Sequence, residues 1–250
     1  MKIRRPSLLA TVSLLAVLVV LTTSGCAVWR IKQAAELARQ SEPFQVSPPG
    51  ASASLLVVGD STAIGTGASA PAHSVAGLIA RDHPYLKVVN RARDGARFED
   101  MARQLGEPAG ERFDAILVLG GGNDVIRLTP NAPLQENISR VAALARTQAG
   151  LVVLMPSGNV GSAPFFFPPW SWLMTQRSKT LHRFVKDIAA ENGALYVNLY
   201  KDKSEDPFAQ RPDELNAKDG LHPSDAGYRL WYAELNTQAD LAQRLAALRR

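Results

Sequence analysis

Residues 54–61 read Ser-Leu-Leu-Val-Val-Gly-Asp-Ser, a short apolar run followed directly by a glycine, an acid and a hydroxyl. A continuous apolar run of this length, bounded by turn residues, is typical of a strand that is buried on both faces. Such strands belong to parallel sheets that are covered by helices on both sides. The stretch therefore predicts a central parallel strand that delivers Ser61 to its carboxyl end.

The rest of the chain repeats this alternation of strand and helix. Further apolar runs that suit strands lie at 86–90, 115–119, 151–155 and 194–199. Apolar residues at helical spacing predict helices at 72–81, 98–105, 134–148, 179–191 and from the N-cap Ser224 toward Leu248. We therefore expect an α/β fold, a three-layer α/β/α sandwich with a five-stranded, mainly parallel sheet. Functional sites in such sheets form at the carboxyl ends of the strands.

Charge and cysteine content exclude several classes of protein. The chain has 28 Lys and Arg against 23 Asp and Glu, but the first 40 residues hold six of the bases and one of the acids. The other 210 residues hold 22 of each, so the body is neutral and gives no reason to expect nucleic acid as a partner. A single cysteine excludes an intrachain disulfide framework, and four histidines without ligand spacing predict no metal. We expect no cofactor.

The excess of Lys and Arg over Asp and Glu lies on both sides of an apolar segment from Leu8 to Leu21. We expect residues 1–29 to be a signal or anchor segment, residues 30–53 a linker and residues 54–250 the folded α/β domain. One interpretation is an uncleaved anchor that runs on to Trp29. A second is a lipoprotein signal, because 23–26 (Thr-Ser-Gly-Cys) resembles a lipobox, apart from its threonine, and Cys26 would carry the lipid.

A cleaved secretory signal is the third interpretation of the N-terminus. All three predict a domain outside the cytoplasm, in the cell envelope and anchored to the membrane, or secreted in the third case. The near-equal division of Lys and Arg around the apolar segment also leaves open a reversed anchor, which would keep the domain in the cytoplasm. The sequence does not indicate an oligomeric state.

Four loops hold the side chains that acyl transfer needs. They contain 59–61 (Gly-Asp-Ser), 90–95 with Asn90 and Gly95, 120–124 (Gly-Gly-Gly-Asn-Asp) and 219–222 with Asp219 and His222. A serine at a strand-to-helix turn is exposed at the sheet edge, and a histidine in a neighbouring loop can take its proton. An acid three residues before that histidine can orient it, and an asparagine amide can donate to an oxyanion.

These four blocks, in this order and over residues 54–236, resemble the GDSL, or SGNH, serine hydrolases. The resemblance implies the SGNH-hydrolase architecture, which is flavodoxin-like, and these roles. Ser61 is the nucleophile, His222 the general base and then acid, and Asp219 the residue that orients His222. The oxyanion hole consists of the Ser61 and Gly95 N–H groups and the Asn123 amide. Thr62 stands where the family motif has leucine, and the charged 91–94 segment before Gly95 is unusual. Asp60 and Asp124 are expected to hold their own loops together.

Other residues compete for these assignments. His73, His83 and His182 lie within or beside helical patterns, and we interpret them as ordinary histidines. Asp202, Asp206 and Asp213 lie in a Pro- and charge-rich stretch that we interpret as a solvated loop. Residues 65–70 match the dinucleotide-binding pattern GxGxxA, but they start too far beyond the strand for that role.

An aromatic segment after the fourth predicted strand is a candidate acyl-binding wall or a lid that touches membrane. Its aromatic residues are Phe165, Phe166, Phe167, Trp170 and Trp172, and packing of a long loop would explain them as well.

The function that we expect is a serine esterase that cleaves carboxylic esters through an acyl-enzyme. An envelope acyltransferase or polysaccharide deacetylase would use the same residues. A non-catalytic envelope binding module is the alternative from another class. The partner would be a small-molecule, lipid or glycan ester.

Overall fold

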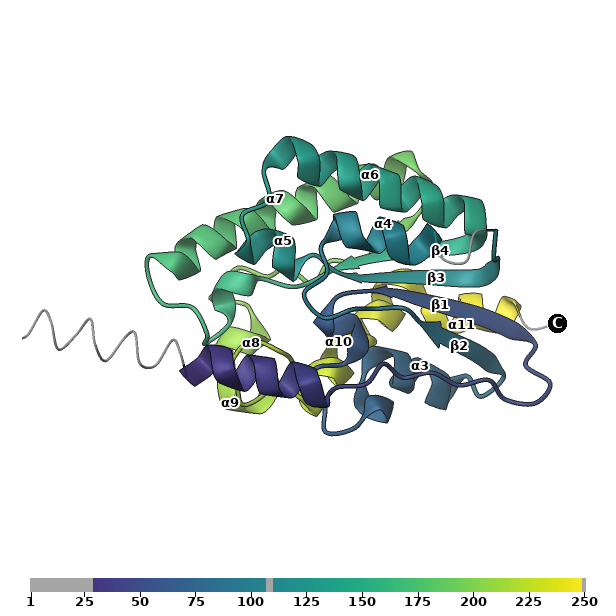
Figure 1. The fold of residues 1–250 in the computed structure, drawn as a ribbon, viewed down its shortest axis with the longest axis horizontal. Helices are drawn as coiled ribbons and strands as arrows, with labels where there is room; N and C mark the ends of the chain where they lie inside the picture. The colour runs from purple at the N-terminus through teal and green to yellow at the C-terminus, as the bar shows by residue number, and fades with distance from the viewer. Residues whose placement is uncertain (1–28, 107–109, 249–250) are drawn as a thin grey trace, which may run out of the picture.

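A computed structural model describes residues 29–106 and 110–248 (Figure 1). Within these ranges one sheet has five strands in the order β2-β1-β3-β4-β5, and all neighbouring pairs are parallel. The strands are β1 (Ala53–Gly59), β2 (Leu86–Asn90), β3 (Phe113–Gly120), β4 (Ala149–Pro156) and β5 (Leu195–Tyr196). This is the flavodoxin-like order, in which the chain reverses its direction of winding between β1 and β3. The α/β fold expected from the sequence is confirmed.

Helices cover both faces of the sheet (Figure 1). One layer consists of α4 (Phe98–Gly106), α6 (Asn131–Gln148) and α7 (Trp170–Glu191), and the other of α3 (Val75–Asp82), α10 (Asp225–Ala239) and α11 (Leu241–Ala247). Several shorter helices follow strands or lie in loops: α2 (Ser61–Ile64), α5 (Gly122–Ile126), α8 (Pro207–Gln210), α9 (Pro212–Leu215) and the 3₁₀ turns η1 (Pro71–His73) and η2 (Val160–Ser162).

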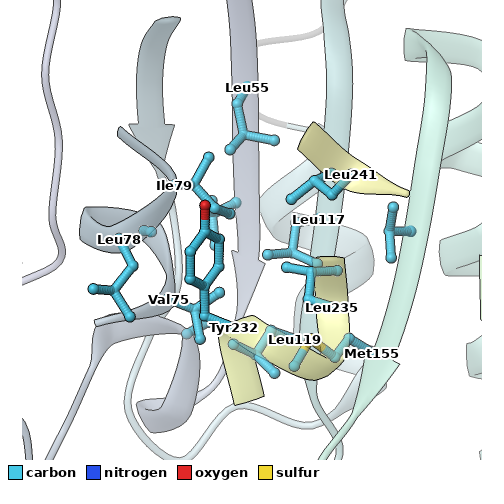
Figure 2. Close-up of a cluster of buried hydrophobic side chains, with 14 of the residues drawn as sticks. Leu55, Val75, Leu78, Ile79, Leu117, Leu119, Met155, Tyr232, Leu235 and Leu241 are labelled. Atoms are coloured by element: carbon cyan, nitrogen blue, oxygen red, sulfur yellow. The ribbon is translucent and has the colours of Figure 1, made fainter. Parts of the chain in front are cut away.

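The continuous apolar strands divide their side chains between two cores. Leu55 and Val57 of β1 point into the core beneath α3, α10 and α11, whereas Leu56 and Val58 point into the core beneath α4, α6 and α7. Alternation of side chains along a strand is the cause, since both faces of this sheet are covered. Figure 2 shows part of the first core, where Tyr232 of α10 lies among aliphatic side chains from the sheet and α3.

Three element boundaries differ from the prediction. Only Leu195–Tyr196 of the expected strand at 194–199 pairs with β4. Helix α7 begins at Trp170 rather than at 179, so Trp170 and Trp172 belong to its first turn. The final helix is divided at Asp240, whose φ of 46° is left-handed. Aspartate tolerates that conformation better than most residues, and this ends α10 before α11 starts.

Part of the expected linker is folded. Residues 29–40, most of which fall within the expected linker at 30–53, are helical. Beyond this helix, Val46 forms an antiparallel bridge with Val88 on the edge strand β2, with N···O distances of 3.1 and 2.8 Å. Residues 1–28, including the apolar segment and Cys26, lie outside the described residues. None of the described helices is long and apolar enough to cross a membrane.

Candidate active site

Ser61 stands at the carboxyl end of β1, where the strand turns into α2. Asp60 is the N-cap of this helix, and its Oδ1 accepts hydrogen bonds from the backbone N of Thr62 at 2.9 Å and from the Thr62 hydroxyl at 2.7 Å. The capped turn fixes the position of Ser61, which is 6% exposed. Its N–H donates no hydrogen bond to the described residues, because the first N–H groups of a helix have no partner within it.

His222 and Asp219 reach Ser61 from the loop between α9 and α10. The Nε2 of His222 lies 2.9 Å from the Oγ of Ser61, and its Nδ1 lies 2.5 Å from the Oδ2 of Asp219. The other carboxylate oxygen, Oδ1, accepts from the backbone N–H groups of Leu221 and His222 at 3.0 and 3.1 Å. These contacts orient the imidazole so that it can accept the proton of the serine hydroxyl.

The carboxyl of Asp219 stays ionised despite its burial. Burial raises the pKa of this group, but the hydrogen bond and charge of His222, with the two backbone donors, outweigh the loss of solvent. The net pKa of Asp219 lies below its ordinary value. A carboxylate in this state can hold Nδ1 in its protonated form and stabilise an imidazolium when one forms.

Gly95 and Asn123 line the same cavity as Ser61. Gly95 has a φ of 71°, which glycine adopts without strain, and its N–H donates to no described acceptor. The Asn123 amide lies 3.3 Å from the carbonyl oxygen of Ala96, a contact that directs the amide along the 95–96 loop. With the N–H of Ser61, these groups offer three uncharged donors at one edge of the sheet.

Two buried acids connect the loops around Ser61. Asp60 Oδ2 accepts from the N–H of Gly121 at 3.1 Å, which joins the β1 turn to the β3 turn, and Asp124 accepts from the N–H of Phe98 at 3.0 Å. Burial raises the pKa of both carboxyls. Each acid therefore binds its loop to a neighbouring element. The sequence had predicted hydrogen bonds within each acid's own loop, and the bonds from Thr62 to Asp60 agree with that prediction.

Gln104 is a supporting residue that the sequence analysis missed. From α4 its side chain accepts from the N–H of Gly59 at 2.8 Å and donates to the carbonyl oxygen of Gly59 at 2.9 Å. These two bonds hold the end of β1 two residues before Ser61. The sequence signal that could have revealed it is the position of this glutamine, three residues after Met101 on the apolar, buried face of the helix.

The other histidines are engaged elsewhere. His182 is buried in α7, between the hydroxyl of Tyr196 at 2.7 Å and the carbonyl oxygen of Ser157 at 2.8 Å. Burial lowers the pKa of His182 to about 4, so it is neutral at physiological pH. His83 bonds to Tyr85 and His73 to Ser69 and Asp225.

The glycines of the 65–70 segment have a packing role. Gly67 has a φ of 94°, and a Cβ there would come within 2.5 Å of the carbonyl oxygen of Pro223 and 3.1 Å of the Cβ of His222. Only a glycine lets this segment pack so closely against the histidine loop. The match to a dinucleotide-binding pattern is thereby explained by the fold.

Among the rival acids, Asp206 differs from the prediction. It is 4% exposed, lines the cavity and caps α8 by accepting from the N–H of Phe208 at 3.0 Å. Burial raises the pKa of this carboxyl. The solvated-loop interpretation is therefore wrong for Asp206, whereas Asp202 and Asp213 are exposed and Asp202 pairs with Lys179.

A cavity of about 410 Å³ opens beside Ser61 and His222. Of the five aromatic residues predicted to bind an acyl chain, Phe165 alone lines it. Phe166 packs against the core beneath α7, whereas Phe167, Trp170 and Trp172 are exposed by 53, 59 and 68%. Residues that the sequence did not indicate, from the helix at 29–40, complete the lining. No cluster of metal-ligating side chains occurs within 29–106 and 110–248.

Comparison with known families accounts for this arrangement. The sequence model of the GDSL-like lipase/acylhydrolase family matches residues 57–230, which include every loop of the site. The chain belongs to this family. The resemblance stated from the four sequence blocks is confirmed, and the protein is a hydrolase that acts on ester bonds. No curated protein matches the chain in sequence.

Several solved structures share the fold of this hydrolase. TesA is 23% identical with a TM-score of 0.60, and the match covers 76% of this chain and 99% of TesA. A lipase/acylhydrolase from Enterococcus faecalis is also 23% identical, with a TM-score of 0.56 and coverages of 77% and 96%. The psychrotrophic esterase EstA from Pseudoalteromonas sp. is 18% identical, with a TM-score of 0.52 and coverages of 75% and 97%.

Proposed function

We propose that this protein is a serine esterase that hydrolyses carboxylic esters through an acyl-enzyme. One observation carries the proposal: hydrogen bonds run without a break from buried Asp219 through His222 to Ser61 at the edge of a cavity. A serine hydroxyl is a weak nucleophile until a base accepts its proton, and this line supplies the base and the group that orients it. Asn123 and Gly95 lie at the same cavity and supply donors for an oxyanion.

The first half of the reaction forms the acyl-enzyme. Nε2 of His222 takes the hydroxyl proton while the Oγ of Ser61 attacks the ester carbonyl carbon. The negative charge on the carbonyl oxygen is held by the N–H groups of Ser61 and Gly95 and by the Asn123 amide. The ester C–O bond then breaks, and the imidazolium returns its proton to the leaving alcohol oxygen.

The second half releases the acid. Water takes the place of the alcohol, His222 accepts one of its protons, and the resulting hydroxide attacks the acyl carbon. When the bond to the Oγ of Ser61 breaks, His222 gives the proton back to the serine. The net reaction consumes one ester and one water, and it forms one alcohol and one carboxylic acid.

A panel of p-nitrophenyl esters from acetyl to palmitoyl tests the proposal. We expect the wild-type chain to release p-nitrophenol and Ser61→Ala to lose at least about 10⁴-fold in kcat while it stays folded. Ser204→Ala, a serine in an exposed loop, is the matched control and should keep wild-type activity. Folded Ser61→Ala that keeps full activity would refute the assignment. Failure of the wild-type chain to hydrolyse any ester would favour the non-catalytic envelope module.

We further propose that the domain acts in the cell envelope, outside the cytoplasm. The support is the apolar segment Leu8–Leu21 with basic residues on both sides, and Cys26 within a lipobox-like stretch. Metabolic labelling with palmitate tests lipidation, with Cys26→Ala as the comparison. If the protein takes up the label and Cys26→Ala abolishes the labelling, the protein is a lipoprotein. If the protein is unlabelled but lies in the membrane fraction, the apolar segment is an anchor. Protein that is found in the cytoplasm would contradict the proposal.

A further inference from the structure

The helix at residues 29–40 lines the cavity beside Ser61. Ile31, Ala34, Ala35 and Ala38 recur at the i, i+3, i+4 and i+7 positions of one helix face, and all four line this cavity. Seven residues at 1.5 Å each give this face a length of about 10 Å. The family match begins only at residue 57, so this wall lies outside the matched region.

Contacts at both ends hold the helix in place. At its start, Arg30 donates to the carbonyl oxygen of Pro164, and its guanidinium lies 4.8 Å from the ring centre of Phe167. After its end, the bridge between Val46 and Val88 fixes the chain to the edge of the sheet. Figure 1 shows the helix, in purple, at the same end of the molecule as the start of α7. The wall is therefore preformed rather than assembled by a ligand.

The lining of the cavity fits an aliphatic chain. Alanine side chains leave room along the helix, and Ile126, Val160 and Phe165 add apolar surface from other elements. Ile31 remains 56% exposed although it lines the cavity, and a bound chain would cover it. A volume of about 410 Å³ lies in the range of small-molecule sites.

A separate observation concerns a polar side chain of the cavity, Ser157. Ser157 lines the cavity and is 5% exposed, and its Oγ has no hydrogen-bond partner among the described residues. A buried hydroxyl without a partner is costly, and an oxygen of a bound ester would satisfy it. The cavity thus combines an apolar wall, which suits an aliphatic chain, with polar groups near Ser61, which suit the oxygens of an ester.

We propose that the 29–40 helix is a chain-binding wall, and that this enzyme prefers esters with an aliphatic chain which lies against Ala34, Ala35 and Ala38. The proposal rests on the esterase function proposed above and names its substrate class. The chain belongs either to the acyl or to the alcohol part of the ester. Each methylene that the wall buries is expected to raise kcat/KM by up to about fourfold until the wall ends.

Two ester series separate the sources of the chain. One series varies the acyl group of p-nitrophenyl esters from acetyl to palmitoyl, and the other varies the alkyl group of acetate esters from ethyl to decyl. The wild-type full-length chain should show a rise of kcat/KM with length in one series. Equal kcat/KM for short and long members of both series would overturn the proposal while leaving the esterase function intact.

Substitution of the wall gives the sharper test. Ala35→Leu places a larger side chain in the cavity, and we expect the ratio of kcat/KM for the eight-carbon over the two-carbon substrate to fall about tenfold. Because the ratio compares two substrates in the same variant, an effect of the substitution on the chemical step that both share cancels out of it. Lys32→Leu, the same new side chain on an exposed position that does not line the cavity, is the matched control.

An unchanged chain-length profile in folded Ala35→Leu, or the same change in Lys32→Leu, would refute the wall. Loss of the esterase function itself has a different signature. In that case wild-type, Ala35→Leu and Lys32→Leu would all fail to hydrolyse every ester in both series. Leucine is a strong helix former, so both variants preserve the helix.

Discussion

The variant Asp219→Asn tests whether catalysis requires the correct orientation and tautomer of His222, since the histidine itself is still present. In the structure, one carboxylate oxygen accepts two backbone N–H groups and the other faces the Nδ1 of His222 at 2.5 Å. An asparagine that keeps the two backbone donors on its oxygen must turn its amide N–H toward Nδ1. The imidazole then carries its proton on Nε2, which faces the Oγ of Ser61 and can no longer accept the serine proton.

The expected loss is large because the wrong tautomer removes the base altogether. An equivalent substitution in a serine protease of unrelated fold lowers kcat by about 10⁴. We expect a decrease of about 10³–10⁴ in kcat for Asp219→Asn, which corresponds to about 4–5 kcal/mol of activation free energy. The mutant side chain keeps the backbone contacts of the loop, so the cavity and the fold should persist.

The assay is steady-state hydrolysis of a p-nitrophenyl ester, with thermal unfolding as a check that each variant folds. Asp225→Asn is the matched control, because this acid lies three residues after His222 and bonds to Ser69 and His73 instead. It should keep activity within about twofold. Folded Asp219→Asn with activity within tenfold of wild type would refute the role assigned to Asp219.

Three further predictions concern single residues. Asn123→Ala should lower kcat by about 10²–10³, the loss typical of one oxyanion donor, and a change below threefold would contradict its role. Gly67→Ala should lower both activity and melting temperature, since its Cβ would press on Pro223 and His222; unchanged kinetics and melting would contradict this. The pKa of His182 is about 4 in the folded protein against 6.5, so between these values the unfolded chain binds a proton that the folded chain does not. The free energy of unfolding should therefore fall by about 3 kcal/mol from pH 7 to 4, and denaturant titrations of His182→Gln should lack this part of the fall; the same slope in both proteins would contradict it.

The sequence predicted the sheet and the reactive loops because each depends on local chemistry. An apolar strand that ends in Gly59-Asp60-Ser61 can be read from eight residues, and Ser224 caps α10 through its own side chain as expected. The spacing of Asp219 and His222 fits a contact within one loop. These features do not depend on what packs against them.

The features that the sequence did not reveal depend on distant partners. The 29–40 helix mixes charged residues with alanines, and its alanine face is meaningful only beside the cavity. Asp206 lies in a charged stretch, yet α8 folds over it and buries it. The role of Gln104 depends on its hydrogen bond with Gly59, which forms only because α4 packs against the end of β1. Contacts between elements far apart in the sequence decide such cases, and local patterns do not encode them.

Labelling by a fluorophosphonate tests the central claim most directly, because this reagent reacts with a serine only when a neighbouring base activates it. The full-length protein is treated with the reagent, digested and analysed by mass spectrometry. The account predicts one adduct on the peptide that contains Ser61, and none in Ser61→Ala. A folded wild-type protein without an adduct on Ser61, or one that carries its adduct on another serine, would contradict it.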